Sequence, residues 1–469
     1  MVLLVLQCCA GRLLLKEIAS LASVNCAAKD ARWECAANAA VALLRTALTD
    51  AVATEGVAGA TAAVVRCGQL EWVGAAGTVS KQQNAAFVTP ETIYVYASTT
   101  KTQVAVMIVA LIESGRLTRG TTLDAFFPDL PNAKSVTVHH LLHHSSGLPD
   151  YEGQLDLSDP AKQYVRKQIL AVVADLPPAF EPPGSKHVYS NTGYVVLGGI
   201  IEAVVSPQSL EQYWDTIIRK RLGLADASWG NPERTGNFAH PIDASGTDQL
   251  IPGVGIPTSY WGPVWTDGGL SSSVADLARF LDGLLVSGLL LSPASVAYMT
   301  EPEGSPDDPY CAGIFERDSP FGALHGHEGS YGGFESQMWT HRSANLTIAV
   351  QLGGEDVADR VWEKVAEAYF SSAYFEAVSR QGFPCPTVLL ARDAAAGPSA
   401  ATSPQKPKLE QNPPAAQPPD ASSSATTAAP VPGSPRLAIS SSNGRFRASA
   451  SGVLGVLIAT VARAVWTRP

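Results

Sequence analysis

Strand patterns at both ends of the patterned part of the chain constrain the fold more than any other feature. β-rich runs occupy residues 60–77 near one end, and residues 336–341 and 346–353 near the other. Between them, residues 117–290 mix short helical patterns with loops rich in Pro and Gly. Strands that come together from distant parts of a chain, around a largely helical insert, are typical of an α+β fold. The sequence therefore predicts an α+β protein with an antiparallel sheet and an α-rich lobe.

Helical patterns flank these strands. Residues 42–56 form an amphipathic pattern, and residues 355–381 are predicted to form one long closing helix. A third helix is predicted after a short β run at residues 94–96, and the segment 139–151 is predicted to end its helix at Gly147. The two terminal helices are expected to flank the sheet, because an amphipathic helix buries its apolar face against another element.

The chain divides into four parts by composition. Residues 1–37 begin with an apolar run that no positive charge precedes, and they are a candidate signal or transit segment. Residues 38–381 carry the patterned domain, and residues 386–447, rich in Ala, Pro and Ser, are predicted to be a disordered linker. Residues 448–469 hold an apolar run shorter than the ~20 residues of a spanning helix. Membrane association through this tail and an unstructured tail are both open, and the compartment is unknown, with secretion or membrane association favoured.

Charge and cysteine content exclude several classes of partner. The chain has a formal net charge of −10 and no basic run, which argues against nucleic acid as a partner. Its seven cysteines include no C-x-x-C spacing, so a zinc ribbon or a thioredoxin-like redox site has no support. No cofactor is predicted.

A serine followed three residues later by a lysine marks the start of the third predicted helix. Ser98 and Lys101 lie one turn apart on the same helical face, so the lysine head can reach the serine oxygen. A simpler interpretation is a helix-capping serine and a lysine whose stem covers apolar surface. The motif recurs at Ser403 and Lys406 in a Pro-rich stretch, so by itself it does not identify a site.

Two further motifs follow the first along the chain: Y-x-N at Tyr189 and H-x-G at His327. The segment HHLLHHSSGLPDY lies between the first and second motifs, and DGGLSSSVADLARF lies between the second and third. With these five segments in this order, the chain resembles the serine β-lactamase-like superfamily, in the branch of class C β-lactamases, DD-carboxypeptidases, D-aminopeptidases and esterases. The resemblance covers residues 38–381. It implies an antiparallel sheet with flanking helices, an all-helical lobe, and a site between the two.

Three residues are assigned to the reaction. Ser98 is the expected nucleophile, and it needs a base because a hydroxyl is a weak nucleophile at neutral pH. Lys101 and Tyr189 are assigned together as a coupled acid–base pair, and the choice of base in acylation stays open between them. Tyr189 is expected to protonate the leaving group and to activate the deacylating water, close to the Lys101 charge and to a protonated His327.

Four residues are expected to bind substrate. Asn191 is predicted to hydrogen-bond the Lys101 head and a substrate amide. By resemblance, His327 stands where β-lactamases carry Lys, and an imidazole holds a carboxylate less firmly than an ammonium does. Gly329 fits a strand that substrate must approach closely. The N–H groups of the nucleophile and of Ser330 are expected to form an oxyanion hole.

A run of histidines does not change this assignment. His139, His140, His143 and His144 include pairs at i and i+4, a spacing that can bind metal. No acidic residue follows as in H-E-x-x-H, and by resemblance the segment is a structural stretch of the family. No metal site is therefore predicted.

The sequence thus predicts a serine hydrolase that forms an acyl-enzyme and hydrolyses a small-molecule ester, amide or peptide. An esterase, a D-amino-acid peptidase and a DD-carboxypeptidase-like enzyme all fit. A catalytically silent binding protein is one alternative, which the intact motif residues disfavour. A true β-lactamase is another, which His327 disfavours. A Lys substituted at His327, with β-lactam turnover as the measurement, separates this last alternative from the first hypothesis.

Overall fold

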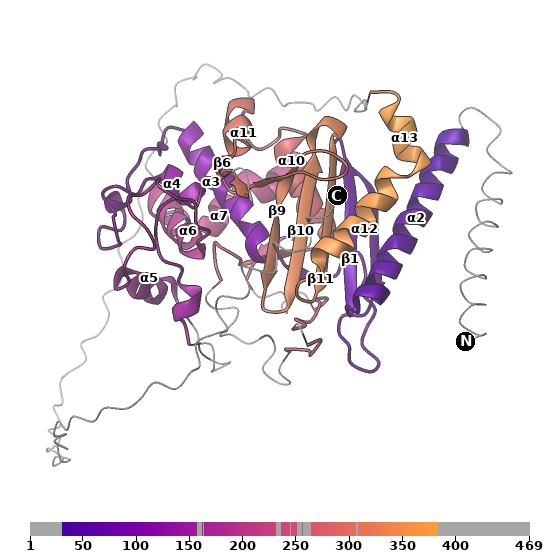
Figure 1. Ribbon diagram of the computed structural model, residues 1–469, viewed down its shortest axis with the longest axis horizontal. Helices are drawn as coiled ribbons and strands as arrows, with labels where there is room; N and C mark the ends of the chain where they lie inside the picture. The colour runs from indigo at the N-terminus through magenta and orange to yellow at the C-terminus, as the bar shows by residue number, and fades with distance from the viewer. Residues whose placement is uncertain are drawn as a thin grey trace, which may run out of the picture. The chain divides into compact units, whose positions relative to one another are not determined.

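Segments from both ends of the described chain meet in one eight-stranded antiparallel sheet (Figure 1). Its strand order is β2-β1-β11-β10-β9-β8-β7-β6. The strands are β1 Gly59–Arg66, β2 Gln69–Gly77, β6 Glu303–Ser305, β7 Asp308–Tyr310, β8 Phe315–Arg317, β9 Leu324–Tyr331, β10 Phe334–His341 and β11 Leu346–Gly353. The predicted α+β architecture, with an antiparallel sheet built from distant segments, is confirmed.

The computed structural model describes residues 31–382, apart from residues 157–161, 163, 231–235, 244, 251–255, 257–263 and 306–307. Residues 1–30 of the candidate signal or transit segment lie outside the described residues. The predicted linker at 386–447 and the predicted tail at 448–469 lie outside them as well.

Strand β1 is buried on both faces of the sheet. Ala62 and Val64 belong to the apolar core on one face, and the alternate residues Ala63 and Val65 belong to the core on the other, as the two-residue period of a strand requires. The turn into β2 has positive φ at Cys67 (52°) and at Gly68 (76°), which a tight hairpin turn needs. The hairpin predicted from the sequence is therefore present.

Helices cover both faces of this sheet. On one face lie α2 Ala31–Glu55, α12 Ala358–Phe370 and α13 Ala373–Ser379, and on the other lies α10 Val274–Leu285 (Figure 1). Part of α2, Cys35–Glu55, has the length and apolar content of a membrane-spanning helix. Its apolar side chains Leu44 and Leu48 are buried in the core that β1, β11 and α12 share, and this packing accounts for the apolar pattern.

The helical lobe surrounds α3 Thr100–Glu113, whose residues are buried on all sides over most of its length. From Val104 to Leu111 every residue of α3 is apolar, and a helical segment that is apolar all round belongs in the interior. The other helices of the lobe are α4 Val138–Leu142, α5 Arg166–Ala174, α6 Asn191–Val205, α7 Leu210–Trp214, α8 Lys220–Leu222 and α11 Pro293–Met299. A second, three-stranded sheet has the order β3 Tyr94–Val95, β5 Leu270–Ser272 and β4 Ser228–Trp229.

The structure corrects two predicted helix ends. Residues 355–381 form α12 and α13 in place of one helix, because Ser372 Oγ accepts from Phe375 N–H at 3.1 Å and donates to the Tyr369 carbonyl at 2.6 Å. A serine in that position caps a new helix start. The helix α4 ends at Leu142, short of the predicted Gly147, because His144 adopts a positive φ of 52° that a right-handed helix cannot contain.

Candidate active site

Ser98 lies in a short 3-10 turn, η1 Ala97–Thr99, that leads directly into α3. Lys101 follows in the first turn of α3. Its Nζ donates to Ser98 Oγ at 2.9 Å and to the carbonyl oxygen of Asp267 at 2.8 Å. The Lys101 side chain is fully buried, so these hydrogen bonds stand in for the water that its head has lost. The structure therefore brings the predicted nucleophile and lysine into direct contact.

The backbone just before Ser98 is held in an uncommon conformation. Ala97 has a positive φ of 49°, which is unfavourable for a residue with a Cβ and is retained only where surrounding contacts impose it. Those contacts converge on the Tyr96 carbonyl, which accepts from Thr99 Oγ1 at 2.9 Å and from Ser336 Oγ at 2.5 Å. Because Ser336 lies on β10, the turn that carries Ser98 is fixed to the sheet.

Tyr189 approaches the same pair from the segment that precedes α6. Ser98 and Lys101 lie beside its hydroxyl, and Lys101 Nζ lies 5.1 Å from the centre of its ring. Burial raises the pKa of Tyr189, while the positive charge of Lys101 and the polar groups of Ser98 and Lys101 beside the hydroxyl oppose that rise. The pKa stays above its usual value, so Tyr189 holds its proton near neutral pH and is available as a proton donor.

Asp267 is a residue of this site that the sequence reasoning did not single out. Besides its carbonyl contact with Lys101, its carboxylate accepts from Tyr151 Oη at 2.7 Å and from Trp265 N–H at 3.2 Å. Burial raises the pKa of Asp267, and the positive charge of Lys101 and the hydrogen bond from Tyr151 oppose that rise without cancelling it. The Asp267 side chain thus belongs to a buried polar network with Tyr151, close to Lys101. The sequence feature that could have indicated Asp267 is its position as the first residue of the DGGL segment.

His327 lies on β9 with its ring fully buried. Its Nδ1–H donates to the Glu328 carbonyl at 2.5 Å, which leaves Nε2 to accept from Tyr310 Oη at 3.1 Å. Burial, assisted by the charge of Lys101, lowers the pKa of His327 to about 3. The imidazole is therefore neutral at pH 7. The protonated His327 that was expected to assist Tyr189 is absent at that pH.

Gly329 lies where β9 passes closest to the nucleophile's turn. A Cβ built at this position would stand 2.4 Å from the Tyr96 carbonyl oxygen and 2.8 Å from the Ser98 nitrogen. Only glycine permits this approach. The next residue, Ser330, lines the same cavity as Ser98, which is the arrangement that the predicted pair of oxyanion-binding N–H groups needs.

Asn191 lies at the first position of α6, two residues after Tyr189. Its backbone N–H donates to Asp150 Oδ2 at 2.7 Å. In the part of the chain that the structure describes, the Asn191 side chain makes no hydrogen bond to Lys101, whose head is held by Ser98 and the Asp267 carbonyl. The predicted contact with the lysine is thus replaced by a backbone contact, and contact with substrate stays a prediction.

A cavity of about 610 Å³ opens in front of these residues. One side of it carries Ser98, Tyr189 and His327, together with Phe315. The rest of the described lining, from β9, β10 and the start of α12, is strongly acidic, and we call it the acidic side. Its described charged residues are Glu328, Glu335, Asp356, Asp359 and Arg360.

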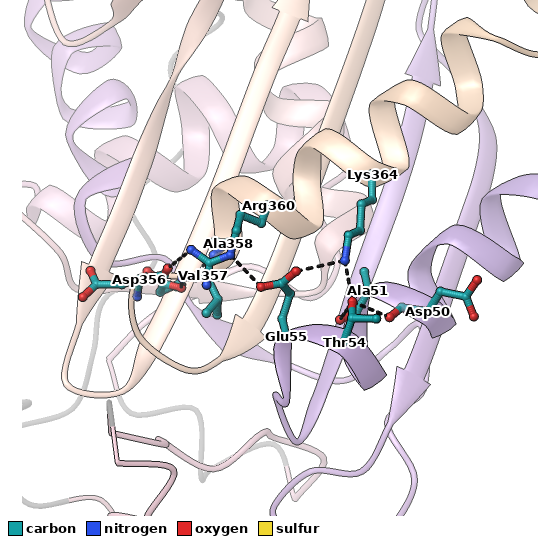
Figure 2. A network of polar contacts seen from close by, with 10 residues as sticks. Asp50, Ala51, Thr54, Glu55, Asp356, Val357, Ala358, Arg360 and Lys364 are labelled. Atoms are coloured by element: carbon teal, nitrogen blue, oxygen red, sulfur yellow. Dashed lines mark hydrogen bonds and ion pairs between the residues drawn. The ribbon is translucent and has the colours of Figure 1, made fainter. Parts of the chain in front are cut away.

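Figure 2 shows the polar contacts that hold Asp356 and Arg360, two of these residues, to the end of α2. Arg360 donates through Nε to Glu55 Oε2 at 2.6 Å and through a terminal nitrogen to the Asp356 carbonyl at 2.8 Å. Lys364 forms a second ion pair with Glu55 at 2.9 Å. These contacts join the C-terminal end of α2 to the first turns of α12. Glu335 accepts from three consecutive N–H groups at the start of α12, a favourable place for a carboxylate.

Known sequences match the part of the chain that carries this site. A family model described as Beta-lactamase matches residues 44–369. Penicillin-binding protein 4* of Bacillus subtilis (strain 168) is 30% identical over 262 residues, or 52% of this chain and 57% of that protein. A putative D-alanyl-D-alanine carboxypeptidase of Escherichia coli (strain K12) is 28% identical over 239 residues, or 43% of this chain and 52% of that protein. The chain thus spans little more than half the length of these relatives.

Solved structures with the same fold cover most of the described residues. A D-stereospecific amidohydrolase from Streptomyces sp. has a TM-score of 0.59 at 25% identity, over 71% of this chain and 98% of that one. The octameric penicillin-binding protein homologue from Pyrococcus abyssi has a TM-score of 0.61 at 27% identity, over 71% and 78%. D-amino acid amidase from Ochrobactrum anthropi SV3, complexed with L-phenylalanine amide, has a TM-score of 0.61 at 23% identity, over 70% and 98%.

Proposed function

Because the chain belongs to the beta-lactamase family, we propose that it is a serine hydrolase that forms an acyl-enzyme on Ser98 and hydrolyses an amide or an ester. The family includes carboxypeptidases and amidases, so hydrolysis is the family's chemistry. The observation that carries the proposal is the 2.9 Å contact between Lys101 Nζ and Ser98 Oγ beside the Tyr189 hydroxyl. A nucleophile with its base and its proton donor in contact is what acyl transfer requires.

In acylation, the Lys101–Tyr189 pair starts with one proton fewer than an ammonium and a phenol carry together, so one member can act as a base. The Ser98 oxygen attacks the substrate carbonyl, and its proton passes to that member of the pair. The N–H groups of Ser98 and Ser330 bind the negative oxygen that forms. The tetrahedral intermediate then collapses: the bond to the leaving group breaks, and Tyr189 gives that group a proton. The pair returns to its starting protonation state when the proton taken from Ser98 moves on to Tyr189.

In deacylation, water replaces the leaving group in front of the ester carbonyl. The same pair takes one proton from the water as its oxygen bonds to the carbonyl carbon. The bond from Ser98 Oγ to that carbon then breaks, and the pair returns the proton to Ser98. The product is a free acid, and the enzyme is regenerated without any cofactor.

The charges of the cavity favour one substrate class among those that the family allows. A substrate with a free carboxylate needs a cation, yet His327 is neutral, since burial holds its pKa at about 3. Among the described residues of the cavity, Arg360 is the one Lys or Arg side chain, and Glu55 already pairs with it. Four carboxylates line the acidic side: Asp359 pairs with Arg317 and Glu335 accepts from the backbone at the start of α12, so Glu328 and Asp356 are the two that carry this argument. We therefore favour an amide whose acyl part carries a free amino group, such as a D-amino acid amide, over a peptide that ends in D-alanine.

Steady-state turnover by the full chain and by Ser98→Ala tests this proposal. The substrates are p-nitrophenyl acetate, D-phenylalanine amide, a peptide ending in D-Ala-D-Ala, and a chromogenic cephalosporin. We expect ester and amide turnover in the wild type and none above background in the variant. An intact-mass increase equal to the acetyl group, seen only in the wild type, would identify the acyl-enzyme.

Each alternative has its own result in this experiment. Equal rates in both proteins, or no turnover in either, would overturn the hydrolase and favour a binding protein. Faster hydrolysis of the cephalosporin than of the amide would favour a β-lactamase. In that case His327→Lys should raise the β-lactam rate further, because an ammonium holds the β-lactam carboxylate more firmly.

A further inference from the structure

A second cavity, of about 410 Å³, lies apart from the one that holds Ser98. Among its lining residues are His139, His143 and Glu303. One ligand atom from each of the three lies within 4.8 Å of the others. His139 and His143 come from α4 and the residue that follows it, whereas Glu303 begins β6, more than 150 residues later. The acidic partner that the sequence around the histidines lacks is therefore supplied by the fold.

The distances between these atoms are those of a site for a small transition-metal ion. His139 Nε2 lies 2.9 Å from Glu303 Oε1, and His143 Nε2 lies 3.9 Å from the same oxygen. Zinc binds His nitrogen and carboxylate oxygen at roughly 2.0–2.2 Å, so two ligands of a tetrahedral ion stand about 3.3 Å apart. These two separations lie on either side of that value, and the two histidine nitrogens lie within 4.8 Å of each other.

The other nitrogen of each ring is already held, as it is in protein metal sites. His143 Nδ1–H donates to the His139 carbonyl at 3.0 Å, so the lone pair of His143 is on Nε2 and faces Glu303. His139 Nδ1 hydrogen-bonds the Tyr298 hydroxyl at 3.1 Å. Partners of this kind fix the tautomer and the orientation of metal-binding histidines.

We propose that His139, His143 and Glu303 form a binding site for a divalent transition-metal ion of the zinc type. Two imidazoles and one carboxylate leave a fourth position for water, and this ligand set favours zinc over magnesium or calcium. The site would tie the end of α4 to β6. His144, directly after His143, packs its ring 4.1 Å from that of Tyr189, so the site lies one residue from the packing around the active-site tyrosine.

The charges around the site are mixed but favour a cation. Arg119 lines the cavity, and its guanidinium lies 3.6 Å from the centre of the Tyr298 ring. Two carboxylates, Glu301 and Glu303, line the same cavity, so they outnumber this positive charge. Glu301 is absent from the ligand set, and it therefore provides a control for charge alone.

The test is calorimetric titration of Zn²⁺ into the full chain after removal of metal with a chelator. The variants are Glu303→Gln, His139→Gln and the matched control Glu301→Gln. Glu303 and Glu301 are both partly exposed, so their amides should fold, and circular dichroism checks this. We expect one zinc per chain at this site. Loss of a ligand should weaken its affinity roughly tenfold or more, while Glu301→Gln changes it less than about threefold.

Each result decides the proposal. Loss of one equivalent of Zn²⁺ in Glu303→Gln and His139→Gln, with Glu301→Gln like the wild type, would support it. Equal stoichiometry and affinity in all four folded proteins would overturn it, as would the absence of any binding by the wild type. Zinc binding that Mg²⁺ at the same concentration displaces would also contradict it, because these ligands discriminate strongly between the two ions.

Discussion

The two sides of the active-site cavity are held together by different kinds of contact. On the side of the nucleophile, Lys101 is buried and its hydrogen bonds go to Ser98 and to a backbone carbonyl. On the acidic side, Arg360 lines the cavity, and behind it Arg360 and Lys364 both reach Glu55 through ion pairs between partly exposed groups. Buried polar contacts are costly to break, whereas exposed ion pairs contribute little. Substitutions on the first side should therefore affect chemistry, and those on the second should have small effects on stability.

The largest expected effect comes from Ser98→Ala. Removing a nucleophile commonly lowers kcat by about four orders of magnitude or more, because the covalent route is lost. The free energy of unfolding should also fall, by about 1–3 kcal/mol, because the buried Lys101 Nζ loses one of its hydrogen-bond acceptors. Ser330→Ala is the matched control: it keeps the N–H group expected to bind the oxyanion, and its kcat/KM should stay within about tenfold of wild type. A similar loss in both variants would contradict the assignment of Ser98 as nucleophile.

Tyr189→Phe should lower kcat by about 10²–10⁴, the usual contribution of a general acid or base. The phenyl ring keeps the packing against His144, so the unfolding midpoint should hardly move. Tyr310→Phe removes a hydroxyl that contacts His327 and not Ser98, and it should cost much less. Equal losses in the two variants would show that Tyr189 acts through general packing and not as a proton donor.

Gly329→Ala tests the close approach between β9 and the turn that holds Ser98. The added methyl would stand 2.4 Å from the Tyr96 carbonyl oxygen, so β9 has to move away. We expect a loss of about 1–3 kcal/mol in the free energy of unfolding. Most of the activity should be lost as well. Gly120→Ala is the control, because a Cβ there meets nothing within 4 Å, and denaturant titration should give an unchanged or slightly higher stability.

The free energy of unfolding should depend on pH in a way that reveals the burial of His327. Its pKa is about 3 in the folded protein and near its ordinary 6.5 in the unfolded chain. Between these two pH values the unfolded chain therefore binds more protons than the folded protein. The contribution of neutral His327 to the free energy of unfolding is complete above pH 6.5, and it is lost as the pH falls toward 3. His327→Gln should flatten this part of the curve of unfolding free energy against pH. An unchanged slope in the variant would mean that His327 titrates normally in the folded protein.

The sequence predicted what its local patterns encode. The runs at residues 60–77 and 346–353 are rich in apolar and β-branched residues, and they form strands of the sheet as predicted. The motif residues Ser98, Tyr189 and His327 meet in one cavity, although their roles stay predictions. The hydrogen bond from Lys101 to the Asp267 carbonyl could not be predicted. Every residue has a carbonyl group, and only the tertiary fold brings this one to the lysine.

The histidine cluster with Glu303 and the strained turn before Ser98 could not be predicted for the same reason: both depend on contacts between distant segments. Glu303 meets His139 only because β6 lies beside α4, and no spacing along the chain indicates that pairing. The positive φ of Ala97 is equally hidden, since alanine is typical of ordinary helical backbone and the contacts from Ser336 impose the conformation from another segment. Features that depend on two distant segments are therefore the ones that the sequence alone leaves out.

The smallest effect, and the one that completes the comparison, is expected for Glu55→Gln. The substitution removes the charge that Arg360 and Lys364 share, but Arg360 keeps its hydrogen bond to the Asp356 carbonyl. Exposed ion pairs contribute about 0.2–1 kcal/mol each, so denaturant titration should show a loss of about 0.5–1 kcal/mol. The loss should shrink in roughly 1 M salt, where screening weakens the wild-type pairs. Turnover of the amide should stay within about twofold. A loss of several kcal/mol, or one that salt does not reduce, would mean that both sides of the cavity are held by buried contacts of the same kind.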